Sequence, residues 1–113
     1  MSFTIDFTGK SGAAYKYWSL DNPTADGIIA AAGNYAFVQQ LQNGNFMPLY
    51  FGVAEDLKAR VPGHERWDEA IKLGATHIMA HTTPAGEEAR LAEERDLIQY
   101  WNPPLNTHHR QVG

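Results

Sequence analysis

The chain has 113 residues, 43% of them hydrophobic and 19% charged, which is the composition of one globular domain rather than of a disordered segment. It contains no cysteine, which excludes a disulfide framework, thiolate metal ligands and a cysteine nucleophile, and no run approaches the ~20 apolar residues that span a bilayer. The net charge of −4 excludes a broadly basic surface, so that any nucleic-acid-binding surface must be local.

Hydrophobic periodicity and turn residues predict several strands and three helices in one compact unit. Residues 3–7 alternate apolar and polar side chains, and Asn43-Gly44 is a strong turn signal between two β-rich runs. We expect strands over residues 3–7, 13–20, 33–41, 48–53 and 75–82, and helices over residues 56–60, 64–73 and 84–101. This order predicts an α/β (α+β) domain with a small, mostly antiparallel sheet flanked by helices.

The expected helix boundaries rest on specific end signals. Pro62 stops the first helix, and Gly74 is the expected C-terminal cap of the second. Thr83 is the expected N-cap of the third helix, with Pro84 in its first helical position.

The third helix carries a carboxylate in an unusual position. At ~100° per residue, Leu91, Ile98 and Trp101 share one face, and Glu94 lies in the middle of that stripe. A carboxylate on a core-facing stripe is costly unless it is paired or holds a metal ion. Periodicity alone favours a salt bridge to Arg90, one turn earlier; the alternative is a ligand for Mg²⁺, which needs only one or two protein carboxylates.

Five short motifs follow one another between residues 33 and 106. They are Gly33-Asn34-Tyr35, Tyr50-Phe51-Gly52, Leu57-Lys58-Ala59-Arg60 with His64, Glu94-Arg95-Asp96-Leu97-Ile98, and Pro104-Leu105-Asn106. Each motif alone is weak, but their order and spacing resemble the GIY-YIG endonuclease superfamily. Asn34 and Phe51 stand where the family name has isoleucine. The resemblance implies a single domain over residues 1–113, with an added N-terminal hairpin (1–32), a core (33–106) and a loose tail (107–113).

The resemblance also implies a function, namely metal-dependent hydrolysis of nucleic-acid phosphodiester bonds with one Mg²⁺ or Mn²⁺ ion. It implies that Tyr35 activates the attacking water and that Tyr50 positions the water or the scissile phosphate. Arg60 would bind the phosphate, which suits a planar guanidinium that matches two phosphate oxygens. A tyrosine has an unperturbed pKa of ~10, so Tyr35 can act as a base near neutrality only if the metal and Arg60 lower that value.

The remaining site residues that the resemblance implies support this chemistry. His64 would assist water activation or phosphate binding, Glu94 would hold the metal ion, and Asn106 would brace the site from behind. Four further residues are expected to bind substrate, the last three within a local basic patch that includes Arg60: Gly52, Lys58, Arg66 and Lys72.

Two rival functions remain open. One is a catalytically inactive domain of the same fold that binds nucleic acid or a protein partner, and the other is an interaction module that uses the aromatic N-terminal hairpin. The complete set of polar site residues favours the enzyme, whereas the acidic net charge favours the rivals. We expect nucleic acid, DNA first, as the partner, and a protein partner as a possible source of specificity. Residues 1–6 lack the features of a signal peptide, so we expect a cytoplasmic protein without membrane association.

Overall fold

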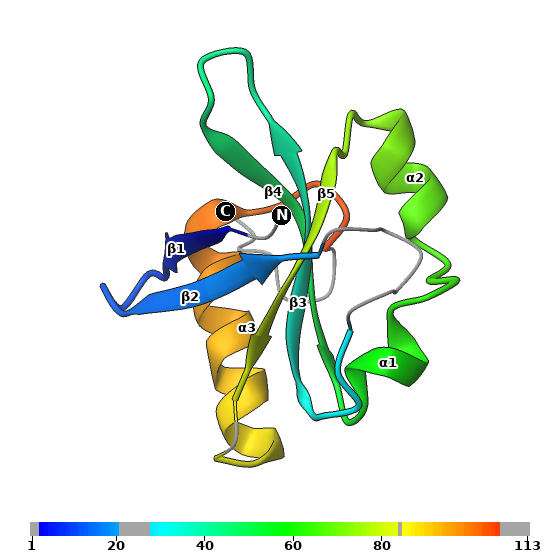
Figure 1. Ribbon diagram of the computed structural model, residues 1–113. Coiled ribbons are helices and arrows are strands. Elements are labelled where there is room, and N and C mark those ends of the chain that lie inside the picture. Colours follow the sequence, from blue (N-terminus) through cyan, green and yellow to red (C-terminus); the bar gives the residue numbers. More distant parts are fainter. Residues whose placement is uncertain (1–2, 21–27, 84, 107–113) are drawn as a thin grey trace.

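The computed structural model describes residues 3–20, 28–83 and 85–106, in which five strands form one curled antiparallel sheet (Figure 1). The sheet has the strand order β1-β2-β5-β3-β4. The elements are β1 (Thr4–Thr8), β2 (Ala14–Ser19), β3 (Gly33–Gln40), β4 (Phe46–Ala54), α1 (Leu57–Arg60), α2 (Trp67–Lys72), β5 (His77–Thr82) and α3 (Glu87–Trp101). The prediction of a small antiparallel sheet flanked by helices is confirmed. Among these helices none is long and apolar enough to cross a membrane.

Helices lie on both sides of the sheet, with α3 on one side and α1 and α2 on the other (Figure 1). Tyr35 and Phe37 of β3 point toward α1 and α2 and pack in a core cluster that includes Leu57. Ala36 and Val38 point the opposite way and pack in a second cluster with residues of α3. Because both faces are covered, β3 is buried over six successive residues, which is typical of a central strand.

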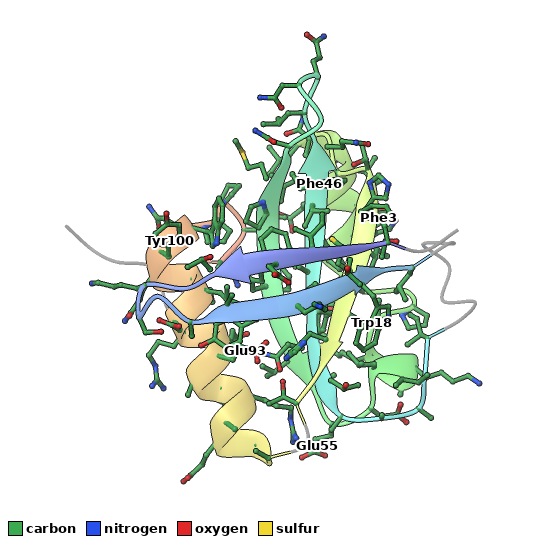
Figure 2. The ribbon with its side chains drawn as sticks, turned by 60° about the vertical axis from the view of Figure 1, so that its left-hand side comes forward. Phe3, Trp18, Phe46, Glu55, Glu93 and Tyr100 are labelled. Carbon is green, nitrogen blue, oxygen red and sulfur yellow. The ribbon has the colours of Figure 1, made fainter. Side chains whose placement is uncertain are left out.

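The β1–β2 hairpin runs across the direction of the other three strands, and its turn lies beside α3 (Figure 2). Strand β2 joins the sheet through β5, where Trp18 faces Ala80 in the register. Phe7 and Tyr17 are fully buried in the same cluster as Leu97 of α3. The N-terminal hairpin is therefore part of the sheet and of the core rather than an appendage to them.

The end of α3 and the segment that follows it contact the two edge strands of the sheet. Trp101 Nε1, at the end of α3, donates a hydrogen bond of 3.0 Å to the backbone carbonyl of Thr8 in β1. The backbone N–H of Leu105 donates to the carbonyl of Leu49 in β4 at 3.1 Å. Residues 101–106 thus cover part of each edge strand, and edges covered in this way are protected against pairing with other chains.

The predicted start of the third helix is wrong. Gly86, with φ at +104°, precedes the first helical residue, Glu87. The hydroxyl of Thr83 does not cap the helix; it lies within hydrogen-bond distance of Asn34 Oδ1 and Glu93 Oε1, both at 3.1 Å. The second helix is shorter than predicted, because residues 64–66 form a turn before it. Pro84, the predicted loop 21–27 and the predicted tail 107–113 lie outside the described residues.

Candidate active site

Three aromatic side chains from separate segments meet on the sheet face covered by α1 and α2. Tyr35 comes from β3, Tyr50 from β4, and His64 from the turn before α2. Their ring centroids lie 5.4 Å (Tyr35–His64), 6.1 Å (Tyr35–Tyr50) and 5.3 Å (Tyr50–His64) apart. Tyr35 is 1% and His64 4% exposed, whereas Tyr50 is only half-buried. We call these three residues the aromatic cluster; Tyr50 is its solvent-facing member.

Gly52 leaves room for the Tyr35 ring, because it has no side chain. The two residues face each other in the register of β3 and β4, and a Cβ on Gly52 would collide with Cζ and the hydroxyl of Tyr35. Gly52 is itself buried. Its visible role is to let the ring lie across β4, which differs from the substrate contact expected from the sequence.

The hydrogen bonds of His64 define which of its nitrogens carries a proton. The backbone N–H of Arg66 donates to His64 Nδ1 at 2.9 Å, so Nδ1 must be unprotonated. Burial, and secondarily the nearby Arg60 cation, lowers the pKa of His64 to about 4, which keeps the imidazole neutral at pH 7. The single ring proton then sits on Nε2, which lies 2.7 Å from the Tyr35 hydroxyl and donates to it. Because the Tyr35 hydroxyl accepts from His64, it can donate its own proton to the Tyr50 hydroxyl. This hydrogen bond from Tyr35 acts to lower the pKa of Tyr50.

Burial dominates the ionisation of both tyrosines. It raises the pKa of Tyr35 well above 10, with a further rise from Tyr50, while Arg60 acts in the opposite direction. The pKa of Tyr50 is also raised by burial, but the hydrogen bond from Tyr35 and the charge of Arg60 both lower it. Without ligand, both hydroxyls are therefore protonated near neutrality. Of the two, Tyr50 has the environment that better supports a phenolate.

Arg60 flanks the aromatic cluster, but its guanidinium is engaged by a carboxylate. Nη1 and Nη2 donate to the two oxygens of Glu65 at 2.9 and 2.8 Å. This hydrogen bond from Arg60 lowers the pKa of Glu65 to about 2. The cation is close enough to the cluster to lower the pKa of both tyrosines and of His64.

The expected basic patch is interrupted by acidic side chains. Arg66 forms an ion pair of 3.2 Å with Glu69, one turn along α2. Lys58 on α1 and Lys72 on α2 are both exposed. Since both arginines of the patch are paired with glutamates, positive potential on this surface rests on the two lysines.

Glu94 belongs to α3, which covers the other face of the sheet and packs against β4, the strand of Tyr50. Its residue is 4% exposed, and burial, opposed by Arg95, raises the pKa of its carboxyl to about 7. Its charge raises the pKa of Tyr50, on which Arg60 acts in the opposite sense. Arg90, the alternative salt-bridge partner, donates to the Thr83 carbonyl at 3.4 Å. Glu94 therefore acts by its charge on Tyr50, the solvent-facing member of the cluster. The described residues include no group of three or more His, Asp or Glu side chains suited to holding a metal ion.

Asn106 holds the backbone of β4 next to Tyr50. Its Oδ1 accepts a hydrogen bond from the N–H of Phe51, and its Nδ2 donates to the carbonyl of the same residue, both at 2.8 Å. Asn106 is fully buried. The pair of bonds fixes the backbone of β4 between Tyr50 and Gly52; that Asn106 thereby braces a catalytic site stays a prediction of the resemblance.

Sequence reasoning missed a buried polar network between β2, β3, β5 and α3. Glu93 of α3 is 4% exposed and lies beside the β1–β2 hairpin (Figure 2). It accepts hydrogen bonds of 3.1 Å from the hydroxyls of Tyr17 and Thr83 and lies 3.4 Å from His81 Nε2. Asn34 donates to the Arg90 carbonyl at 3.0 Å. The Asn34 that replaces an isoleucine in the first motif therefore connects β3 to α3.

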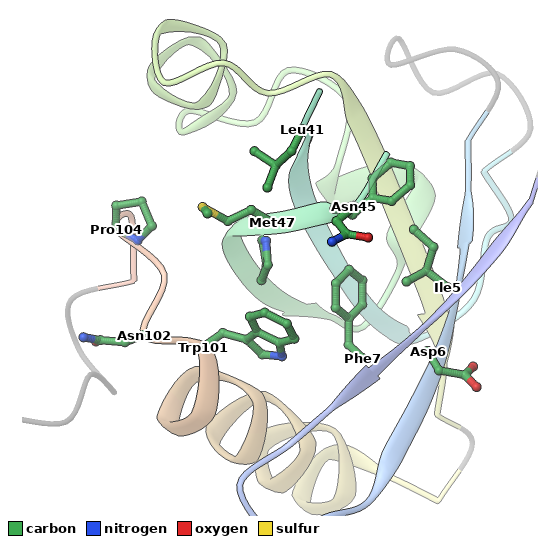
Figure 3. Close-up of a pocket in the computed structure, with 11 residues that line it drawn as sticks. Ile5, Asp6, Phe7, Leu41, Asn45, Met47, Trp101, Asn102 and Pro104 are labelled. Atoms are coloured by element: carbon green, nitrogen blue, oxygen red, sulfur yellow. The ribbon is translucent and has the colours of Figure 1, made fainter. Parts of the chain in front are cut away.

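A separate pocket of about 510 Å³ lies between β1, the β3–β4 turn and the end of α3 (Figure 3). Its lining is mainly apolar, with Phe7, Met47 and Trp101 around it, and it includes none of the predicted site residues. The aromatic cluster, flanked by Arg60, thus remains the part of the described structure in which predicted site residues meet. No protein-family model, curated protein or solved structure matches this chain.

Proposed function

We propose that the protein is a metal-dependent endonuclease of the GIY-YIG type that hydrolyses phosphodiester bonds in nucleic acid, with DNA as the first candidate substrate. The observation that carries the proposal is the chain of contacts from His64 through Tyr35 to Tyr50, beside the Arg60 guanidinium. These residues come from motifs separated by up to 29 positions and meet in one place. Phosphoryl transfer depends mainly on positioning and charge neutralisation, which such a group can supply.

The geometry favours Tyr50 as the residue that meets the attacking water. Tyr35 is buried, and its hydroxyl stands between His64 and Tyr50. As Tyr50 loses its proton, the hydrogen bond from Tyr35 and the positive charge of Arg60 stabilise the developing phenolate. Tyr35 and His64 act behind Tyr50 as positioning residues, and Arg60 would neutralise the phosphoryl oxygens.

Glu94 is the proposed ligand for one Mg²⁺ or Mn²⁺ ion. One protein carboxylate, completed by waters and substrate phosphate, is a donor set that Mg²⁺ accepts. When bound, the ion would supply positive charge to the phosphoryl oxygens and acidify a bound water. Since the pKa of Glu94 is raised to about 7, the ion must compete with a proton, and its binding should strengthen as the pH rises.

A second candidate is a non-catalytic domain that binds nucleic acid or a protein. The specific observation in its favour is that Arg60 and Arg66 are both paired with glutamates, on a chain whose net charge is −4. In either case the lack of cysteine suits a reducing compartment, and we propose that the protein acts in the cytoplasm.

A cleavage assay tests the proposal. Labelled branched, nicked, linear and single-stranded DNA and the matching RNAs are incubated with the protein in Mg²⁺, Mn²⁺ or EDTA. We expect metal-dependent cleavage that falls roughly 100-fold or more in Tyr50→Phe and in Arg60→Gln. Tyr100→Phe is the matched control, because Tyr100 is an exposed tyrosine on α3. Cleavage that persists in EDTA, or that survives both site variants, would contradict the proposal, and metal-independent binding without cleavage would support the second candidate.

A further inference from the structure

Glu65 binds Arg60 in the same geometry in which a phosphate group would bind it. The two guanidinium nitrogens of Arg60 each donate to a different oxygen of the Glu65 carboxylate, at 2.9 and 2.8 Å. Arg–carboxylate and Arg–phosphate pairs use this same parallel arrangement of two N–H···O bonds. While Glu65 holds both nitrogens, those two donors are not available to a phosphate group.

The position of Glu65 places its charge at the aromatic cluster. Its Oε2 lies 3.7 Å from His64 Nδ1, and its charge acts on both Tyr35 and Tyr50. The Arg60 and Glu65 side chains are 40% and 69% exposed, so the pair can open without disturbing the core. Exposed ion pairs usually contribute little to stability, and a bidentate pair is among the stronger of them. A phosphate that offers Arg60 the same two bonds can replace Glu65.

We propose that Glu65 is an internal competitor for the substrate phosphate, which occupies the Arg60 guanidinium in the free protein and is displaced when a phosphodiester binds. The inference rests on the proposed function in one respect, namely that Arg60 receives a phosphate.

The exchange replaces one anion by another and needs no proton. Because the pKa of Glu65 is lowered to about 2, the carboxylate remains a competitor throughout the neutral range. A small phosphate must displace a carboxylate that is attached nearby and therefore always present at high local concentration. A nucleic acid gains further contacts along its backbone, for example with exposed Lys58, so the competition selects polyanions over single phosphates.

Glu65→Gln tests the inference, with Glu69→Gln as the matched control. Each variant removes one negative charge from an exposed arginine–glutamate pair on neighbouring segments. Glu65 holds two nitrogens of Arg60 at 2.9 and 2.8 Å, whereas Glu69 contacts the single Nη1 of Arg66 at the longer distances of 3.3 and 3.2 Å, so its removal should free fewer donors. The probe is a fluorescein-labelled single-stranded oligonucleotide in EDTA, followed by anisotropy, with unlabelled inorganic phosphate as a competitor. We expect Glu65→Gln to bind the oligonucleotide about three- to tenfold more tightly than the parent, and Glu69→Gln to change the affinity less than about twofold.

A third variant assigns the gain to Arg60. Glu65→Gln combined with Arg60→Gln should lose the added affinity, and inorganic phosphate should compete better in Glu65→Gln than in the parent. Equal gains in both glutamate variants, or a gain that survives loss of Arg60, would overturn the inference. A parent that cleaves nothing while Glu65→Gln still gains affinity would reject the nuclease and leave the competitor in place. Metal-dependent cleavage by the parent, without any gain in oligonucleotide affinity in Glu65→Gln, would support the nuclease and reject Glu65 as the competitor.

Discussion

Replacing Glu94 by glutamine should stabilise the metal-free protein at pH 8 and change its stability much less at pH 5. Burial raises the pKa of this carboxyl from 4.5 to about 7. The folded protein therefore binds the Glu94 proton more tightly than the unfolded chain does. It follows that the free energy of unfolding decreases as the pH rises from about 4.5 to about 7, and is constant above that range as far as this group is concerned.

The size of the effect follows from the same shift. One unit of pKa corresponds to ~1.4 kcal/mol, so the full shift amounts to roughly 3 kcal/mol, of which ~2–3 kcal/mol develops between pH 5 and pH 8. Glu94 is only 4% exposed, so solvent screening reduces this value little. Glutamine keeps the shape of the side chain and cannot ionise. The difference in unfolding free energy between Glu94→Gln and the parent should therefore grow by up to that amount over this pH range.

Urea unfolding followed by tryptophan fluorescence at pH 5 and pH 8 measures the difference, with exposed Glu88→Gln as the control. Thermal melts at pH 8 with and without Mn²⁺ form the second arm, in which the ion should raise the melting temperature of the parent but not that of Glu94→Gln. The reasoning is refuted if Glu94→Gln is less stable by ~3–5 kcal/mol at both pH values, which is the cost of breaking a buried ion pair. If Mn²⁺ also leaves the parent unchanged, the metal assignment fails with it.

Three further variants probe the site by stability. Gly52→Ala should cost about 1–3 kcal/mol in urea unfolding, because the added methyl group meets the Tyr35 ring; an unchanged midpoint would show that the ring can move aside. Asn106→Ala removes both side-chain bonds to the Phe51 backbone and should cost about 2–4 kcal/mol in the same assay, whereas a loss under 1 kcal/mol would mean that water replaces them. The pKa of His64 is lowered from 6.5 to about 4, so the contribution of His64 to stability is lost as the pH falls through that range, opposite in sign to that of Glu94; thermal melts of His64→Gln should lack this component, and parallel pH profiles of parent and variant would contradict the assignment.

Local signals predicted the elements of this fold well. The Asn43-Gly44 turn and the alternation in residues 3–7 depend on short-range chemistry, and the strands expected from them are present. The prediction of where α3 starts was wrong for the opposite reason, because it depends on contacts between distant parts of the chain. Thr83 has the side chain of a good N-cap, but its hydroxyl contacts Asn34 and Glu93, partners that only the folded chain brings near.

The site shows the same division. The family resemblance was enough to expect Tyr35, Tyr50 and His64 together. The two tyrosines lie on the paired strands of one hairpin, and His64 follows the short helix after it. The position of Glu93 could not be obtained from a helical wheel that assumes one buried stripe. Helix α3 is covered by β4 on one side and by the N-terminal hairpin, through Tyr17, on another, so a second row of its side chains is buried. The contact of Glu65 with Arg60 likewise depends on the path of the turn after α1, which the sequence does not specify.

The contacts of residues 101–106 with both sheet edges bear on the order in which the protein folds. Trp101 and Thr8 are 93 positions apart, and Asn106 and Phe51 are 55 apart, so these bonds close long loops. Contacts of such long range form late, after local hairpins and helices. During synthesis the edge strands remain exposed until this segment has emerged, and that interval is when a neighbouring chain can pair with them. The rate at which residues 101–106 dock, rather than the stability of the finished sheet, should then determine how much newly made protein aggregates.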